Sequence, residues 1–403
     1  MQTVAAPLLA KDITAKKSYR IDAIDLLRGL VMIIMALDHT RDFFHSEALL
    51  NDPLNLATTT PALFLTRFIT HFCAPVFVFL AGTSAFFQSL RKSKSQLSGF
   101  LIKRGLWLIF VELFIISFSV TFDVSYSFVV LQTIWAIGAS MIILGLVLYL
   151  PFAAILTLGL LIVMGHNVLD FYEAGKANKF SLFYQFMHVQ GLFKISDAHT
   201  VVIMYPLLPW AGLMMLGFSF GKIYQMFNEN ERRKALTYMG VSIIALFIIL
   251  RAINVYGDPE PWSAQKDSLF SFLSFINVHK YPPSLLFMAV TIGPALLFLA
   301  WVGDTKTTLG KIITVYGRVP FFYYVIHFFL LHILTTIFFF GKGYTITDGL
   351  KAAPFKFTFP PGDGFSLWVV YAVWLFIVIA LYPLCKWFSE YKKTHKQWWL
   401  SYL

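Results

Sequence analysis

Residues 26–45 read LLRGLVMIIMALDHTRDFFH, an apolar run that ends in a cluster of charged and titratable side chains. The first twelve residues of this stretch contain one charge, whereas the last eight contain two aspartates, one arginine and two histidines. Ionisable groups inside a membrane are costly and usually face a cavity or a partner. The stretch therefore predicts a membrane-spanning helix with a cluster of functional or ion-paired groups at its far end.

The composition of the whole chain is typical of a membrane protein. Of its 403 residues, 58% are hydrophobic and 13% are charged, and the mean hydropathy is +0.70. A soluble domain is about 45–50% apolar and about 25% charged. Because apolar runs of roughly 20 residues recur along the chain, we expect an all-α, polytopic helical bundle with about ten transmembrane helices. The expected spans are 23–43, 63–90, 99–120, 127–149, 152–168, 203–224, 236–254, 282–302, 318–340 and 365–388.

Lysine and arginine are distributed unevenly between the two sides of this expected bundle. The side that holds both chain ends carries 19 of them, and the opposite side carries 11. Cytoplasmic loops are enriched in these residues, so both termini are expected in the cytoplasm. The predicted organisation is a cytoplasmic tail over 1–22, one transmembrane domain over 23–388 and a cytoplasmic tail over 389–403. The net charge of +11 gives no indication of nucleic-acid binding, because the basic residues form no dense patch.

The first cluster of candidate site residues lies at the extracytoplasmic end of the first span. In a helix, Asp38, Arg41, Asp42 and His45 share one face, at i, i+3, i+4 and i+7. His39 lies one turn from Asp42. A carboxylate beside an imidazole fixes the tautomer of the ring and raises its basicity, as general-base catalysis requires. The alternative is a salt-bridge network that closes the helix end, and spacing alone leaves both interpretations open.

A second cluster is expected at a similar depth in the next span. Arg67 and His71 are four residues apart in LTRFITHF and therefore lie on one helix face. The alternative for His71 is a purely structural histidine. Farther along the same span, Gly82, Thr83 and Ser84 are small enough to allow close contact with another helix.

The remaining candidates lie near the ends of the first and ninth spans. His327 is a candidate for lining a cavity, whereas His332 points to another side of the same helix and is expected to be structural. Arg28 and Arg318 lie at the cytoplasmic side, where arginine is suited to bidentate contacts with phosphate. The alternative for Arg28 is a simple buried ion pair with Asp25. The histidine and aspartate spacings match no zinc pattern, so no metal site is expected.

Seven stretches of the chain carry a resemblance to a known family. They are IDAIDLLRGLVMIIMALDH, HFCAPVFVFLAGTSAFF, VVLQTIWAIGASMII, YPLLPWAGLMMLGFSFGKIY, KYPPSLLFMAVTIGPALLFLA, YGRVPFFYYVIHFFLLH and WWLSYL. The chain resembles bacterial members of the heparan-α-glucosaminide N-acetyltransferase catalytic-domain family, a group of transmembrane acyltransferases. The D-x-L-R-G start and the P-x-F-V-F-x-x-G-T-S second span are specific in combination and weak apart.

The resemblance implies a multi-pass enzyme of the bacterial inner membrane. Such an enzyme takes an acetyl group from cytoplasmic acetyl-CoA and transfers it to an amino sugar or a glycan hydroxyl on the far side of the membrane. The catalytic histidine of the family falls on His39 or His45, with His71 as a third candidate. The lysosomal members carry an acidic residue where His71 aligns and a longer insert before their histidine, so the alignment does not single out one base.

Within this hypothesis the other candidates have assigned roles. Asp38 or Asp42 would orient the imidazole, and the donor would be held by Arg28, Arg318 and His327. The expected partners are the lipid bilayer, acetyl-CoA and a sugar or glycan acceptor, without nucleic acid, and a homodimer is one option for the quaternary state. The alternative function is a multi-span transporter or exporter of a small solute, although no internal repeat supports it.

Overall fold

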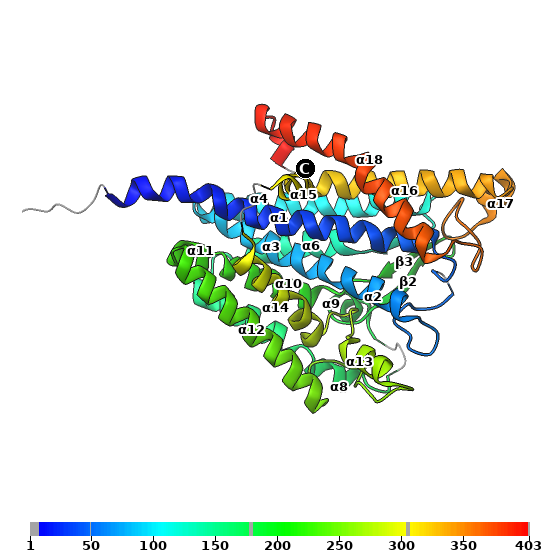
Figure 1. Ribbon diagram of the computed structural model, residues 1–403, viewed down its shortest axis with the longest axis horizontal. Helices are drawn as coiled ribbons and strands as arrows, with labels where there is room; N and C mark the ends of the chain where they lie inside the picture. Colours follow the sequence, from blue (N-terminus) through cyan, green and yellow to red (C-terminus); the bar gives the residue numbers. More distant parts are fainter. Residues whose placement is uncertain (1–7, 49, 177–179, 304–306, 402–403) are drawn as a thin grey trace, which may run out of the picture.

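A computed structural model describes residues 8–48, 50–176, 180–303 and 307–401, and the described chain is mostly helical (Figure 1). The longer helices are α1 (Leu8–Phe44), α3 (Cys73–Ser89), α4 (Lys94–Phe110), α6 (Thr133–Val147), α7 (Phe152–Gly165), α10 (Leu207–Phe220), α12 (Glu229–Ile253), α14 (Leu285–Trp301), α15 (Thr308–Arg318), α16 (Pro320–Gly341) and α18 (Leu367–Thr394). The shorter ones are α2 (Pro61–Ile69), η1 (Thr70–Phe72), the π-helix η2 (Val111–Ile116), α5 (Ser117–Thr121), α8 (Val168–Glu173), α9 (Leu182–Met187), α11 (Ile223–Met226), α13 (Ser268–Ile276), α17 (Ile346–Lys351) and η3 (Trp398–Ser401).

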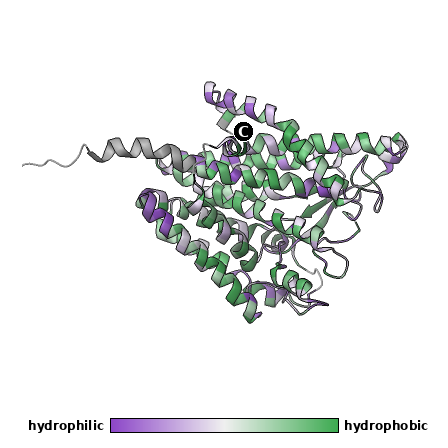
Figure 2. Ribbon diagram, viewed as in Figure 1, coloured by the Kyte–Doolittle hydropathy of each residue, from purple (hydrophilic) through white to green (hydrophobic). Residues whose placement is uncertain are grey.

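Four segments of the described chain are long and apolar enough to cross a membrane. They are Pro61–Ser89, which joins α2, η1 and α3, and the helices α12, α16 and α18. Helices α6, α7 and α14 are apolar but shorter. Each of the ten expected spans contains a helix, and the number that cross the bilayer stays a prediction. Figure 2 shows hydrophobic residues along most of the bundle and hydrophilic residues at the start of α12 and the end of α18, which lie on the same side of the view.

Helix α1 lies in the interior of the bundle. It contacts α15, α16 and α18 on one side and α3 on another, while α10 joins α3 to α6 and α7. Gly29 and Gly317 allow the backbones of α1 and α15 to come into direct contact. A Cβ on Gly29 would lie 2.0 Å from the carbonyl oxygen of Ile313. Gly82 and Gly217 have the same role between α3 and α10, which confirms the close helix contact expected around Gly82.

The main departures from the expected helices lie at span boundaries. Residues 128–131 form a strand, β1 (Phe128–Leu131), instead of the start of a helix. This strand pairs in parallel with β3 (His199–Ile203), which pairs antiparallel with β2 (Gly191–Ser196), giving the order β1-β3-β2. The long apolar stretch near 318 divides at Val319 into α15 and α16, and Pro320 begins α16, a position where its missing N–H costs no hydrogen bond.

Candidate functional site

The charged end of α1 forms an ion-pair network with α2. Asp38 lies 3.0 Å from Nη2 of Arg41 and accepts a hydrogen bond from Nη1 of Arg67, and Nη2 of Arg41 lies 2.5 Å from Asp42. Asp38 and Arg41 are buried, at 8% and 5% exposed. The helix continues to Phe44, so the i, i+3, i+4 spacing places these groups together as expected. Each of the two carboxylates is paired with an arginine, and neither is paired with a histidine.

His39 is oriented by a second histidine instead of a carboxylate. Its Nδ1 lies 2.7 Å from Nε2 of His327, a residue 288 positions away on α16. Nδ1 of His327 lies 3.1 Å from the carbonyl oxygen of Tyr323. A carbonyl oxygen can only accept, so Nδ1 of His327 carries the proton and its Nε2 is the acceptor. The proton between the two rings therefore belongs to Nδ1 of His39, and Nε2 of His39 keeps its lone pair.

A cavity of about 400 Å³, which we call the His39 cavity, lies against this network. It is lined by groups from the end of α1, by Arg67, by residues around β1 and by two loop segments. The polar side chains in its wall are Asp38, His39, Arg41, Asp42, His45, Ser46, Arg67, Gln132, Thr133, Tyr205, Lys280, Tyr281 and Thr358. The expected cluster at the end of α1 and Arg67 of the second cluster thus line one cavity, whereas His71 does not.

A second cavity, of about 290 Å³, lies nearer the other end of α1, and we call it the Arg28 cavity. Its polar and charged lining is Arg28, Ser84, Gln88, Arg104, Thr133, Arg318, Tyr324 and Lys392. Nη1 of Arg28 lies 2.9 Å from Asp25 and 3.1 Å from the carbonyl oxygen of Gly317, so the ion pair with Asp25, given above as the alternative for Arg28, is present. Thr133 lines both the His39 cavity and the Arg28 cavity.

The structure separates the other histidine candidates. His71 is fully buried in η1 between Phe68 and Phe287, and it lines neither the His39 cavity nor the Arg28 cavity. His45 follows the last residue of α1 and lines the His39 cavity. Partial burial, together with the Arg41 guanidinium, lowers the pKa of His45.

His332 has the structural role that its position predicts. Its two ring nitrogens lie 3.0 Å from the carbonyl oxygen of Ser119 and 2.7 Å from that of Lys356. It therefore fixes the loop before α18 against α5. Phe355, Thr358 and Phe359 of this loop line the His39 cavity, so His332 supports the wall of the cavity without facing it.

Sequence reasoning missed the contribution of the loop between α13 and α14. Lys280 and Tyr281 line the His39 cavity and also a polar cavity of about 700 Å³ beside it. Burial raises the pKa of the Tyr281 phenol, but the ammonium of Lys280 and the guanidinium of Arg67 outweigh it and hold this pKa below its usual value. No helical spacing relates this loop to α1, which is why no pattern in the sequence indicated it.

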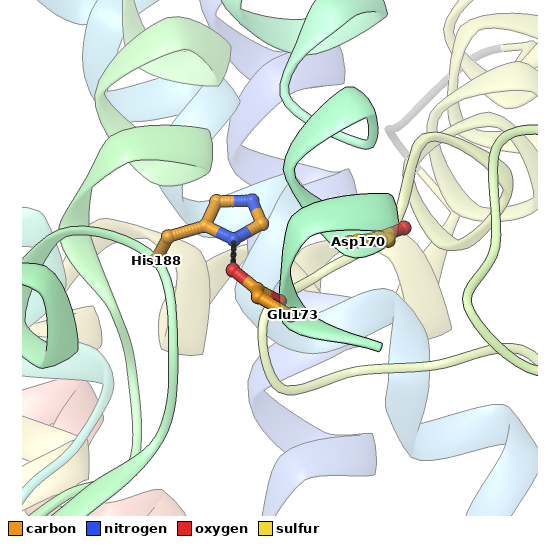
Figure 3. A group of neighbouring side chains, drawn as sticks. All are labelled: Asp170, Glu173 and His188. Carbon is orange, nitrogen blue, oxygen red and sulfur yellow. Dashed lines mark hydrogen bonds and ion pairs between the residues drawn. The ribbon is translucent and has the colours of Figure 1, made fainter. Parts of the chain in front are cut away.

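One group of side chains in the described chain has spacing that suits a metal ion: Asp170, Glu173 and His188 (Figure 3). In the structure these groups are engaged in hydrogen bonds. Oε1 of Glu173 lies 2.6 Å from Nδ1 of His188 and accepts from the Tyr184 hydroxyl at 2.8 Å, and Asp170 accepts from Asn167 at 2.7 Å. This network accounts for the geometry of the group, and a metal would have to replace it.

The described chain is a bundle of apolar helices in which His39, paired with His327, lines the His39 cavity. Residues 20–254 match the family model described as heparan-alpha-glucosaminide N-acetyltransferase, catalytic. The match spans more than half of the chain, so the protein belongs to this family. No curated protein matches the chain. The family indicates a membrane acetyltransferase and favours an enzyme over the transporter alternative, while Lys280 and His327 lie beyond the matched residues.

Proposed function

We propose that the protein transfers an acetyl group from cytoplasmic acetyl-CoA to a sugar or glycan acceptor on the extracytoplasmic side, with His39 as the general base. One observation carries the choice of His39: the hydrogen bonds from His327 to the Tyr323 carbonyl and from His39 to His327 leave a lone pair on Nε2 of His39. His39 lines the His39 cavity, and its Nε2 has no hydrogen-bond partner among the described residues. His327 has the orienting role that a carboxylate has in a Ser-His-Asp triad.

The proposed reaction needs one proton acceptor that later becomes a donor. Nε2 of His39 takes the proton from the acceptor hydroxyl or amine as its oxygen or nitrogen attacks the thioester carbonyl carbon. The tetrahedral intermediate then collapses, the carbon–sulfur bond breaks, and the imidazolium returns the proton to the CoA sulfur. The acetyl group passes directly to the acceptor, and CoA leaves as the free thiol.

The Arg28 cavity is the proposed site of the donor. Arg28, Arg318, Arg104 and Lys392 supply positive charge there, and guanidinium groups suit the phosphates of CoA. Because Thr133 lines both cavities, the two cavities adjoin at this residue, and we propose that the thioester reaches His39 past it. From the sequence, His327 is expected among the donor-binding residues. Here we propose that it orients the His39 ring instead.

The proposal includes the expected topology. The basic ends of the chain would lie in the cytoplasm, with 23–388 as one multi-pass domain of the bacterial inner membrane between tails at 1–22 and 389–403. The hydrophilic start of α12 and end of α18 lie on the same side of the bundle, which supports this orientation (Figure 2).

The test uses purified full-length protein in lipid nanodiscs with labelled acetyl-CoA and a panel of sugar acceptors. His39→Ala should lower transfer by about 100-fold or more, because a positioned general base contributes about 10²–10⁴-fold. His71→Ala, in a buried histidine outside both cavities, is the matched control and should keep transfer. CoA binding by both variants shows that they fold.

Two results would overturn the mechanism. One is full transfer by a folded His39→Ala variant. The other is labelled acetyl trapped on the protein when no acceptor is present, because direct transfer leaves no acetyl-enzyme to trap.

A further inference from the structure

The proposed transfer builds up negative charge on the oxygen of the acetyl group. As the acceptor attacks the carbonyl carbon, an electron pair of the C=O bond moves onto this oxygen, and hydrogen-bond donors aimed at it lower the barrier. His39 cannot be that donor, because its free Nε2 accepts the proton of the attacking group. The His39 cavity therefore needs a second group, and the Tyr281 phenol in its wall meets the requirements.

The Tyr281 hydroxyl is connected to the end of α1 through Arg67. Nη2 of Arg67 lies 3.5 Å from the phenol oxygen, and Nη1 of Arg67 donates to Asp38, the residue before His39. Asp38, His39, Arg67 and Tyr281 all line the His39 cavity. Arg67 thus ties the phenol to the helix end that carries the proposed base.

The same hydroxyl is connected to the junction of the two cavities through Tyr205. The rings of Tyr205 and Tyr281 pack edge to face, with their centres 5.2 Å apart. The Tyr205 hydroxyl interacts with both the Tyr281 hydroxyl and the Thr133 side chain. Because the two cavities adjoin at Thr133, a thioester that passes this residue on its way to His39 would meet the Tyr281 phenol.

The Tyr281 phenol has a proton to donate. The guanidinium of Arg67 can only donate to the phenol oxygen, and Tyr205 donates to it as well. Across the residues that the structure describes, the phenol itself donates to no acceptor. Burial raises the pKa of Tyr281, but the cations of Lys280 and Arg67 hold this pKa below its usual value. The proton is therefore available and loosely held, as suits a donor to a developing oxyanion.

We propose that Tyr281 is a catalytic residue that donates a hydrogen bond to the thioester oxygen of acetyl-CoA. In the tetrahedral intermediate this oxygen carries the negative charge, and Tyr281 keeps its proton throughout. When the intermediate collapses, the C=O bond re-forms and the CoA sulfur leaves with the proton that His39 held. The inference rests on the proposed function, and it applies equally to an amine and a hydroxyl acceptor because the oxyanion belongs to the donor.

Infrared spectroscopy of the bound donor tests this contact without any transfer. Full-length protein in nanodiscs is loaded with acetyl-CoA that carries ¹³C in the thioester carbonyl, and no acceptor is added. A hydrogen bond weakens the C=O bond, so the carbonyl band of the wild-type complex should lie at lower frequency than that of free acetyl-CoA. Tyr281→Phe should lose this shift, whereas Tyr205→Phe, which keeps the Tyr281 proton, should retain it.

The kinetics of transfer test the role of Tyr281 in the transition state. Tyr281→Phe should lower kcat about 100-fold, the usual effect of removing one oxyanion donor, and leave KM for acetyl-CoA nearly unchanged. Tyr238→Phe, in an exposed tyrosine of α12, is the matched control and should keep both constants. A rise in KM alone, or full kcat in a folded Tyr281→Phe variant, would overturn the inference.

The infrared result separates this inference from the proposed function. Bound acetyl-CoA with an unshifted band, or with a shift that persists in Tyr281→Phe, rejects Tyr281 as the donor even if transfer is observed. A shift that Tyr281→Phe abolishes supports Tyr281 even if no acceptor in the panel is acetylated. A protein that does not bind acetyl-CoA at all rejects the proposed function, and the inference falls with it.

Discussion

Asp38 is the residue on which the ion-pair network depends, because it is the shared partner of Arg41 and Arg67. Asp38→Asn would leave both guanidiniums without their shared anion in a buried place. Breaking a buried pair by removing one partner costs about 3–5 kcal/mol. We expect a loss of about 3 kcal/mol in the free energy of unfolding, measured by denaturation in detergent micelles.

The control for this change is Asp52→Asn, at an exposed position of the loop between α1 and α2. The Asp52 side chain accepts from the backbone N–H of Leu54, and an asparagine oxygen keeps that contact. Surface substitutions usually stay within about 0.5 kcal/mol. Equal losses in the two variants would contradict the importance assigned to the Asp38 network.

His327 is a positioning residue, and its effect should differ from that of a donor-binding residue. His327→Ala removes the acceptor of the His39 Nδ1 proton and lets the ring rotate. We expect kcat to fall about 100-fold, since small misplacements of a catalytic group have effects of that size. KM for acetyl-CoA should stay unchanged. Ile333→Ala, on an exposed part of α16, is the control, and a rise in KM alone would contradict the positioning role.

At the level of single residues, the sequence predicted what lies within one helix. The shared face of Asp38, Arg41 and Asp42 follows from helical periodicity. The pairing of His39 with His327 does not, because the two residues are 288 positions apart and meet only when α1 packs on α16. The expected contact between a carboxylate and His39 is not made, because Asp38 pairs with Arg41 of its own helix and with Arg67 of α2, and Asp42 pairs with Arg41.

Among the helix pairs, the packing of α3 on α10 depends on small residues at their contact. A Cβ on Gly82 would lie 2.1 Å from the carbonyl oxygen of Met214, which is backbone and cannot rotate away. Gly82→Ala should therefore lower the free energy of unfolding by about 1–3 kcal/mol, the usual cost of overpacking. Thermal unfolding in detergent measures it.

Gly99→Ala, on α4, supplies the control for this prediction. A Cβ there would meet nothing within 4 Å, and alanine is the better helix former by about 1 kcal/mol. Gly99→Ala should therefore be neutral or stabilising. A similar loss in both variants would show that alanine acts through something other than the contact between α3 and α10.

The turn before β1 is stabilised by an ionised carboxylate. Asp123 accepts hydrogen bonds from the backbone N–H groups of Ser125, at 3.1 Å, and Ser127, at 3.0 Å, and from both hydroxyls. Burial raises the pKa of Asp123, but these hydrogen bonds outweigh it and hold the pKa well below its usual value. The carboxylate therefore stabilises the fold at neutral pH, and this contribution is lost as pH falls below about 4 toward the folded-state pKa.

Asp123→Asn tests this pH dependence. At pH 7 the variant should be less stable than the wild type by about 1–3 kcal/mol, the usual value for hydrogen bonds to a charged group. The difference should shrink as the pH of the unfolding experiment is lowered below about 4. Asp197→Asn, on the exposed turn between β2 and β3, is the control. A difference that does not change with pH would contradict the role of the ionised carboxylate.

Element boundaries were harder to predict than element existence. Apolar periodicity indicated a helix in every expected span, but residues 128–131 form β1 because they pair with β3, 72 positions away in the parallel register. The hydrogen bond of Glu112 likewise depends on a distant segment. Its carboxylate accepts from the backbone N–H of Trp135, in the first turn of α6, a partner that its own helix does not reveal.

For the whole molecule, the testable expectation is its orientation in the membrane. Ser95→Cys lies on the proposed cytoplasmic side and Ala264→Cys on the opposite side, and both positions are exposed. Cys73 and Cys385 are buried and provide little background. In intact spheroplasts, a membrane-impermeant maleimide should label Ala264→Cys and not Ser95→Cys. Labelling of Ser95→Cys before the cells are opened would reverse the proposed orientation.

The sequence by itself determined the class of the protein and which of its charged groups share one helix face. Hydrophobic run length predicts helices because an apolar stretch must satisfy its backbone groups internally, and helical spacing places neighbours on one face. Only the tertiary structure decided which groups from separate helices meet. The pairing of His39 with His327 and the exposure of Lys280 to two cavities both depend on contacts between distant segments, whose side-chain geometry no local period encodes.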